Sequence, residues 1–165
     1  MQKEFPTEQL TYGLFGKRGQ STDSLQKRYT KQRIRFPVNL DTSSAGHIQA
    51  GDEPLESALR ELKEELGISA TPEQLHFAGT FPISFAKEFH GKMFRDEEIA
   101  FVYIYQEPVN TAELVLQTEE VEEVQWFDLE EVYEQCGKRR EIFCVPEGGL
   151  GVVRSYLKSI EKKLG

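Results

Sequence analysis

The stretch GHIQAGDEPLESALRELKEELGI, residues 46–68, decides the fold of this chain. It predicts a helix that begins near Pro54, because proline is preorganised for a first helical position. Gly67 stands where a left-handed residue commonly ends a helix. Four leucines recur at steps of four, three and four residues, which gives the helix one apolar face for the core. These leucines are Leu55, Leu59, Leu62 and Leu66.

Three carboxylates fall on another face of the same helix. Glu61, Glu64 and Glu65 are neighbours there, because positions three and four apart meet on a helix surface. Each like-charge pair costs ~0.2–0.5 kcal/mol on an exposed helix, and a divalent cation would reverse that repulsion. Carboxylate oxygens suit hard ions such as Mg²⁺ or Mn²⁺. The pattern therefore has two interpretations, a divalent-metal site and a solvated acidic face.

The stretch also resembles the signature of the Nudix hydrolases. That signature reads Gly, five residues, Glu, seven residues, then Arg-Glu-U-x-Glu-Glu-x-Gly-U, where U is a bulky aliphatic residue. One position departs from it, because Asp52 stands in place of the first Glu and is one methylene shorter. This difference affects the positioning of the loop before the helix and leaves the acidic face unchanged. The matching residues are Gly46, Arg60, Glu61, Leu62, Glu64, Glu65, Gly67 and Ile68.

The resemblance implies an enzyme, a metal-dependent pyrophosphohydrolase. Its substrate would be a nucleoside diphosphate linked to another moiety, with water attacking one phosphorus and Mg²⁺ or Mn²⁺ as cofactor. The metal ligands that the resemblance implies are the carboxylates of Glu61, Glu64 and Glu65 and the carbonyl of Gly46. Arg60 would orient the glutamates by ion pairing. The alternative for Arg60 is an exposed side chain paired with Glu56, four residues earlier.

The signature leaves the general base open. Family members use either a signature glutamate or an acidic residue from a later loop. The candidates outside the signature are Glu98, Glu119 and Glu120. Each of these has a competing interpretation as a solvated surface carboxylate, which is where charged side chains normally lie.

A basic segment precedes the signature and is a candidate for holding the non-reacting phosphate. Arginine suits that role, because its guanidinium makes bidentate contacts with phosphate. We take Arg28, Arg33 and Arg35 as candidate substrate-binding residues, with His47 beside them. A solvated charged face is the alternative interpretation of the basic segment.

A second, narrower resemblance concerns residues 24–127, where LQKRY, DTSSAGHI and AGD are similar to the Nudix branch often associated with isopentenyl-diphosphate isomerase. In true isomerases a Cys precedes the Gly-His pair, the His binds metal, and a glutamate falls where Glu98 stands. Here Ala45 occupies the Cys position, and a methyl group does no acid–base chemistry. An isomerase and a catalytically silent nucleotide-binding Nudix domain are therefore the alternatives. The intact glutamates of the signature argue against the silent domain.

Composition bounds the remaining possibilities. A chain of 165 residues predicts a single domain, residues 1–165, with residues 1–8 loosely held. The net charge of -8 argues against binding a nucleic-acid polymer and leaves a small-molecule diphosphate as the expected partner. The sequence has neither a signal-peptide pattern nor an apolar run near the ~20 residues of a membrane span, so we expect a cytoplasmic protein without membrane contact. A homodimer is compatible with these features.

The remaining elements predict the α/β class, as an α/β/α sandwich around a mixed sheet, which is also the fold that the Nudix resemblance implies. Residues 17–23 are expected to form a loop, and residues 85–95 a hairpin that turns at His90–Gly91. Pro82 is expected to interrupt the strand that contains it. The expected strands are 10–16, 24–29, 43–48, 74–84, 98–106, 114–116 and 121–128, and the expected later helices are 128–136 and 149–164.

Overall fold

The computed structural model describes residues 7–18, 21–29, 40–42, 44–119, 121–138 and 147–165. For residues 7–18, 21–29, 40–42, 85–89 and 94–96 the description covers the backbone alone. The strands are β1 (Thr7–Arg18), β2 (Ser21–Tyr29), β3 (Leu40–Thr42), β4 (Ser44–His47), β5 (Leu75–Phe89), β6 (Lys92–Tyr105) and β7 (Val121–Asp128). The helices are α1 (Pro54–Leu66), α2 (Leu129–Cys136) and α3 (Glu147–Leu164), with short 3₁₀ turns at Pro72–Gln74 and Thr111–Glu113.

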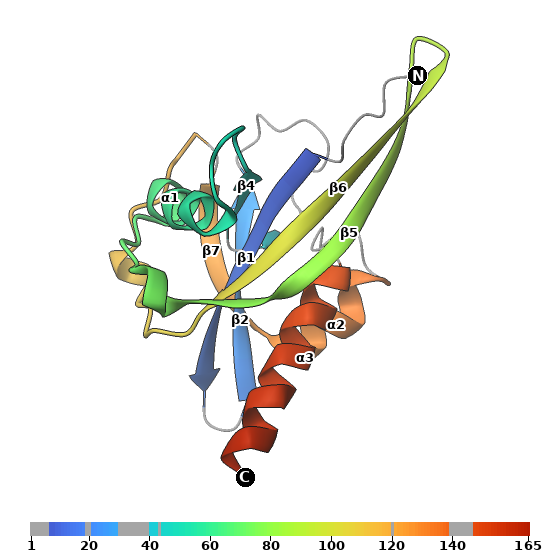
Figure 1. The fold of residues 1–165 in the computed structure, drawn as a ribbon. Helices are drawn as coiled ribbons and strands as arrows, with labels where there is room; N and C mark the ends of the chain where they lie inside the picture. The colour runs from blue at the N-terminus through green and yellow to red at the C-terminus, as the bar shows by residue number, and fades with distance from the viewer. Residues whose placement is uncertain (1–6, 19–20, 30–39, 43, 120, 139–146) are drawn as a thin grey trace.

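Within these residues the strands form one mixed sheet (Figure 1). Its main path runs β3-β2-β1-β6-β5, while β4 pairs with β1 and β7 pairs with β2. The pairing of β1 with β6 is parallel, and the other pairings are antiparallel. The predicted mixed sheet is therefore confirmed.

The two faces of the sheet are covered by different helices (Figure 1). Because side chains alternate along a strand, β6 contributes to both cores. Tyr103 and Tyr105 pack in one hydrophobic cluster with Leu62 and Leu66 of α1. Ala100, Val102 and Ile104 pack in a second cluster with Leu129 and Val132 of α2 and with Leu150 and Val153 of α3. The α/β/α arrangement follows from this division.

Helix α1 has the ends that its sequence predicts. Pro54 stands in the first turn, and Gly67 ends the helix with φ 71°, its N–H bonded to the carbonyls of Leu62 and Lys63. The backbone N–H groups of Val115 and Gln117 donate to the carbonyls of Leu66 and Glu65, at 3.2 and 3.0 Å. These two bonds satisfy carbonyls that the last helical turn leaves without intrahelical partners.

Several predicted elements differ from the structure. The strand predicted at 114–116 is wrong. The backbone of this segment hydrogen-bonds to the end of α1 instead of pairing with a strand of the sheet. The loop predicted at 17–23 is also wrong, since β1 extends to Arg18 and β2 begins at Ser21. Pro82 does not interrupt β5, because β5 is an edge strand and a proline there need not donate to a ladder.

The hairpin between β5 and β6 is confirmed. His90 has φ 51° and Gly91 has φ 75°, as a tight two-residue turn of type I′ requires. The two strands extend well beyond the body of the domain (Figure 1). Among the described residues, no helix has the length and apolar character needed to cross a membrane.

Helices α2 and α3 are joined by a charged pair. Arg154 donates to both carboxylate oxygens of Glu130, at 2.9 and 2.6 Å, and its guanidinium lies 4.0 Å from the centre of the Tyr133 ring. The hydrogen bond from Arg154 is the main cause that lowers the pKa of Glu130. A carboxyl whose pKa is lowered in the folded state stabilises the fold above its unfolded pKa of ~4.3 and loses that contribution as the pH falls.

We therefore expect Glu130→Gln to destabilise the protein by at most ~1 kcal/mol at pH 7, since exposed ion pairs contribute little. The difference from the parent should shrink as the pH is lowered from neutral through the carboxyl range. Urea unfolding at a series of pH values measures this difference directly. A difference that stays constant with pH would contradict an electrostatic contribution from this pair.

Candidate active site

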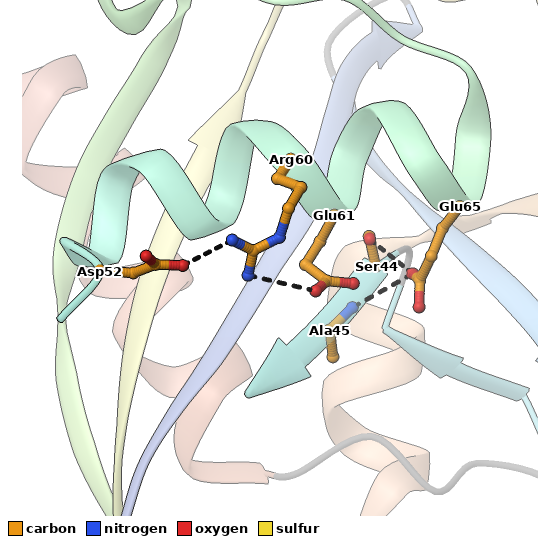
Figure 2. A network of polar contacts seen from close by, with 6 residues as sticks. All are labelled: Ser44, Ala45, Asp52, Arg60, Glu61 and Glu65. Carbon is orange, nitrogen blue, oxygen red and sulfur yellow. Dashed lines mark hydrogen bonds and ion pairs between the residues drawn. The ribbon is translucent and has the colours of Figure 1, made fainter. Parts of the chain in front are cut away.

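The site is built where the last turn of α1 meets β4. The Ser44 hydroxyl donates to Oε2 of Glu65 at 2.5 Å, and the backbone N–H of Ala45 donates to the same oxygen at 3.3 Å (Figure 2). Ser44 is fully buried and Glu65 is 1% exposed. A carboxylate is buried only when hydrogen bonds or charges compensate it, and β4 supplies two of those bonds.

Gly46 brings the backbone of β4 against Glu61. A Cβ added at Gly46 would lie 2.7 Å from Oε1 of Glu61, closer than real Cβ contacts allow. Ser44 and Gly46 share one face of β4, because strand residues two apart point the same way. The strand register places them on the α1 side, opposite Tyr12 and Leu10 of β1.

Arg60 links the loop before α1 to the acidic face. It donates to Asp52 at 2.6 Å, and its other terminal nitrogen lies 3.8 Å from Oε1 of Glu61 (Figure 2). The hydrogen bond that Arg60 donates to Asp52 is the main cause that raises the pKa of Arg60, so the guanidinium stays charged. The shorter aspartate thus reaches Arg60 from the first Glu position of the signature. Arg60 is paired there and not with Glu56, the alternative that the sequence offered.

The other predicted site residues are spread more widely. Glu64, His47 and Glu119 are exposed. Glu98 is 6% exposed, and alternation along β6 places it on the face that carries Ala100, away from α1. His47 shares that face, because it pairs with Gln9 and Gln9 pairs with Ala100. The register therefore separates Glu98 and His47 from Glu61 and Glu65 by the thickness of the sheet.

Some predicted residues fall outside this description. Arg33, Arg35 and Glu120 lie outside the described residues, and Arg28 is described in its backbone alone, within β2. Their proposed roles in binding phosphate or activating water stay predictions.

The donors on the α1 side are oxygen atoms, which suit Mg²⁺ or Mn²⁺ better than softer metals. Glu61 lies against the Gly46 backbone, and Glu65 is bonded to Ser44 and Ala45. In the part of the chain that the structure describes, no three His, Cys, Asp or Glu side chains are close enough together to hold a metal ion. The chemistry of the donors fits such an ion, and convergence of Glu61, Glu64 and Glu65 on it stays a prediction.

Sequence reasoning missed Ser44 as part of this site. The signature begins at Gly46, so its spacing carries no information about the residue two positions earlier. The signal that could have found it was alternation along the strand, since a residue two before Gly46 must share its face.

Comparison with models of protein families assigns the chain to a family. The model of the NUDIX domain matches residues 10–144. The chain belongs to the Nudix family. This match covers α1, β4 and every described residue of the candidate site.

Individual relatives agree with the assignment. An uncharacterized Nudix hydrolase of Clostridium acetobutylicum is 42% identical over 85 residues, 52% of this chain and 39% of its own length. An uncharacterized Nudix hydrolase of Yersinia pestis is 34% identical over 113 residues, 68% of this chain and 54% of its own length. This Nudix chain thus spans about half or less of the length of these curated relatives.

Solved structures share the fold. The binary complex of a C. elegans Ap4A hydrolase has a TM-score of 0.62 and 18% sequence identity, and the match covers 93% of this chain and 98% of that chain. At this identity the likeness supports the Nudix fold and carries no information about substrate.

Proposed function

We propose that this Nudix protein hydrolyses a diphosphate bond in a nucleoside diphosphate linked to another moiety, with Mg²⁺ or Mn²⁺ as cofactor. The observation that supports this most is the packing of two signature carboxylates against β4. Glu61 lies close to Gly46, and Glu65 accepts hydrogen bonds from the Ser44 hydroxyl and the Ala45 N–H. A solvated acidic face, the competing interpretation, needs no buried carboxylate. Glu65 is almost completely buried, so at least one of the three is not a solvated surface charge.

In this proposal each residue of the α1 side has a separate task. Glu61, Glu64, Glu65 and the Gly46 carbonyl would hold the cation. When bound, a divalent cation neutralises charge on phosphate oxygens and acidifies water. Arg60, fixed by Asp52, would limit the positions that the Glu61 carboxylate can take.

The general base and the phosphate-binding residues are proposed from chemistry alone. Glu119 and Glu120 stand before β7, and Glu98 stands on the opposite sheet face, so Glu98 would need a substrate that reaches that face. Arg28, Arg33 and Arg35 would hold the non-reacting phosphate through bidentate contacts.

A panel of diphosphate compounds tests the proposal. The panel includes Ap4A, the compound after which the C. elegans hydrolase is named, together with nucleoside diphosphate sugars and dinucleotides. We expect at least one compound to be hydrolysed with Mg²⁺ or Mn²⁺ and none in the presence of a chelator, with products identified by mass spectrometry. The absence of metal-stimulated turnover across the panel would favour the silent nucleotide-binding domain.

The isomerase alternative makes an opposite prediction. Ala45 provides only a methyl group where the isomerases have a catalytic Cys, and this side chain offers no proton to an isoprenoid carbon. We expect no conversion of isopentenyl diphosphate to dimethylallyl diphosphate. Incubation in deuterated water followed by mass spectrometry is the measurement, and deuterium entering the isoprenoid carbons would contradict the expectation.

A further inference from the structure

We propose that Ser44 is a positioning residue, whose hydroxyl holds the Glu65 carboxylate in the orientation that metal binding needs. The inference rests on the proposed function, because it assumes that Glu65 is a metal ligand. Ser44 itself would touch neither metal nor substrate.

The geometry assigns this role to Ser44 for three reasons. Its Oγ lies 2.5 Å from Oε2 of Glu65, a length typical of hydrogen bonds from hydroxyl groups to charged carboxylates. The bond joins residues 21 apart in sequence, so it ties the last turn of α1 to β4. Both side chains are at most 1% exposed, so little water competes for the bond.

The backbone around Glu65 is held as well. Its carbonyl accepts a hydrogen bond from the N–H of Gln117 at 3.0 Å, while its side chain accepts from Ser44 and Ala45. Main chain and carboxylate are thus restrained from two directions. A ligand restrained in this way loses less conformational entropy when it binds an ion, and partners of this kind commonly change metal affinity 10–100-fold when removed.

Ser57 provides a matched comparison within the same helix. It is fully buried like Ser44, but its Oγ has no hydrogen-bond partner among the described residues. Burial of a serine by itself therefore does not indicate a positioning role. The distinguishing feature of Ser44 is the carboxylate that its hydroxyl reaches.

The test measures Mn²⁺ binding to the full chain without substrate. The electron paramagnetic resonance signal of free Mn²⁺ monitors the binding. We expect Ser44→Ala to weaken binding about tenfold, the low end of the usual range, because the Ala45 N–H still donates to Glu65. Ser44→Thr, which keeps a hydroxyl, should bind more tightly than Ser44→Ala. Ser57→Ala should bind Mn²⁺ like the parent.

The outcomes separate this inference from the proposed function. A parent protein that binds no Mn²⁺ contradicts the proposed function itself. Parent-like or tighter binding by folded Ser44→Ala overturns the positioning role and leaves the proposed function intact. If Ser44→Ala does not fold, Ser44→Cys replaces it, because a thiol fills the site but is a weak donor. Parent-like binding by folded Ser44→Cys would then overturn the role.

Discussion

Replacing Glu65 with glutamine is expected to lower turnover at least ~10²-fold, which corresponds to ~2.7 kcal/mol of activation free energy. The substitution keeps the shape of the side chain and removes its charge. The amide oxygen can still accept from Ser44 and Ala45, so the metal-free protein should remain folded. The loss should therefore lie in metal binding and catalysis. Steady-state rates at saturating Mg²⁺, with urea unfolding of the same samples, measure the two effects separately.

Glu56→Gln is the matched control for this experiment. Glu56 lies on the same helix and is exposed, and the sequence places it outside the acidic face. It should retain the rate of the parent protein. Equal losses from Glu56→Gln and Glu65→Gln would mean that the faces of α1 are wrongly assigned.

Replacing Gly46 with alanine is expected to lower turnover by about 10²-fold with little change in stability. The added Cβ would enter the space of the Glu61 carboxylate. Because that carboxylate ends a flexible side chain, it can move away at small cost to the fold. Displacement of a catalytic group by about 1 Å is enough to lower rates by about 10²-fold. Turnover rates of the purified variant check the expected loss of activity, and urea unfolding checks the expected stability.

Gly151→Ala is the control for the glycine substitution. Gly151 lies in α3, where the nearest atom to an added Cβ is 3.9 Å away, on the Tyr133 ring. Alanine should stabilise this helix by up to ~1 kcal/mol and leave turnover unchanged. Turnover by Gly46→Ala at the parental rate would show that close approach at this glycine is not needed for catalysis.

The features that the sequence predicted correctly have local causes. Pro54 and Gly67 set the two ends of α1 through their own backbone preferences. His90 and Gly91 adopt the positive φ angles of a tight turn. The helix expected at 128–136 is observed as α2, and Asp128 caps it by accepting a hydrogen bond from the Glu131 N–H at 3.0 Å. Each of these depends on a few consecutive residues, so no knowledge of the whole fold was needed.

The features that the sequence did not predict depend on neighbours far along the chain. Pro82 is tolerated because β5 lies at the sheet edge, and strand order is not readable from one segment. The segment 114–116 has strand composition but satisfies the end of α1 instead. Glu98 is a candidate base because the family resemblance implies an acidic residue outside the signature, whereas its face depends on the pairing of β6 with β1. Ser44 joins the site through a contact 21 residues away.

The most direct test of metal-dependent hydrolysis is reaction of the panel compounds in water enriched in ¹⁸O, with and without Mg²⁺. If water attacks phosphorus as proposed, one phosphate-containing product should carry one ¹⁸O atom. We expect this label only when Mg²⁺ or Mn²⁺ is present, and a strongly reduced yield from Glu65→Gln. Labelled product formed equally well in the presence of a chelator, or by Glu65→Gln at the parental rate, would contradict the proposed function.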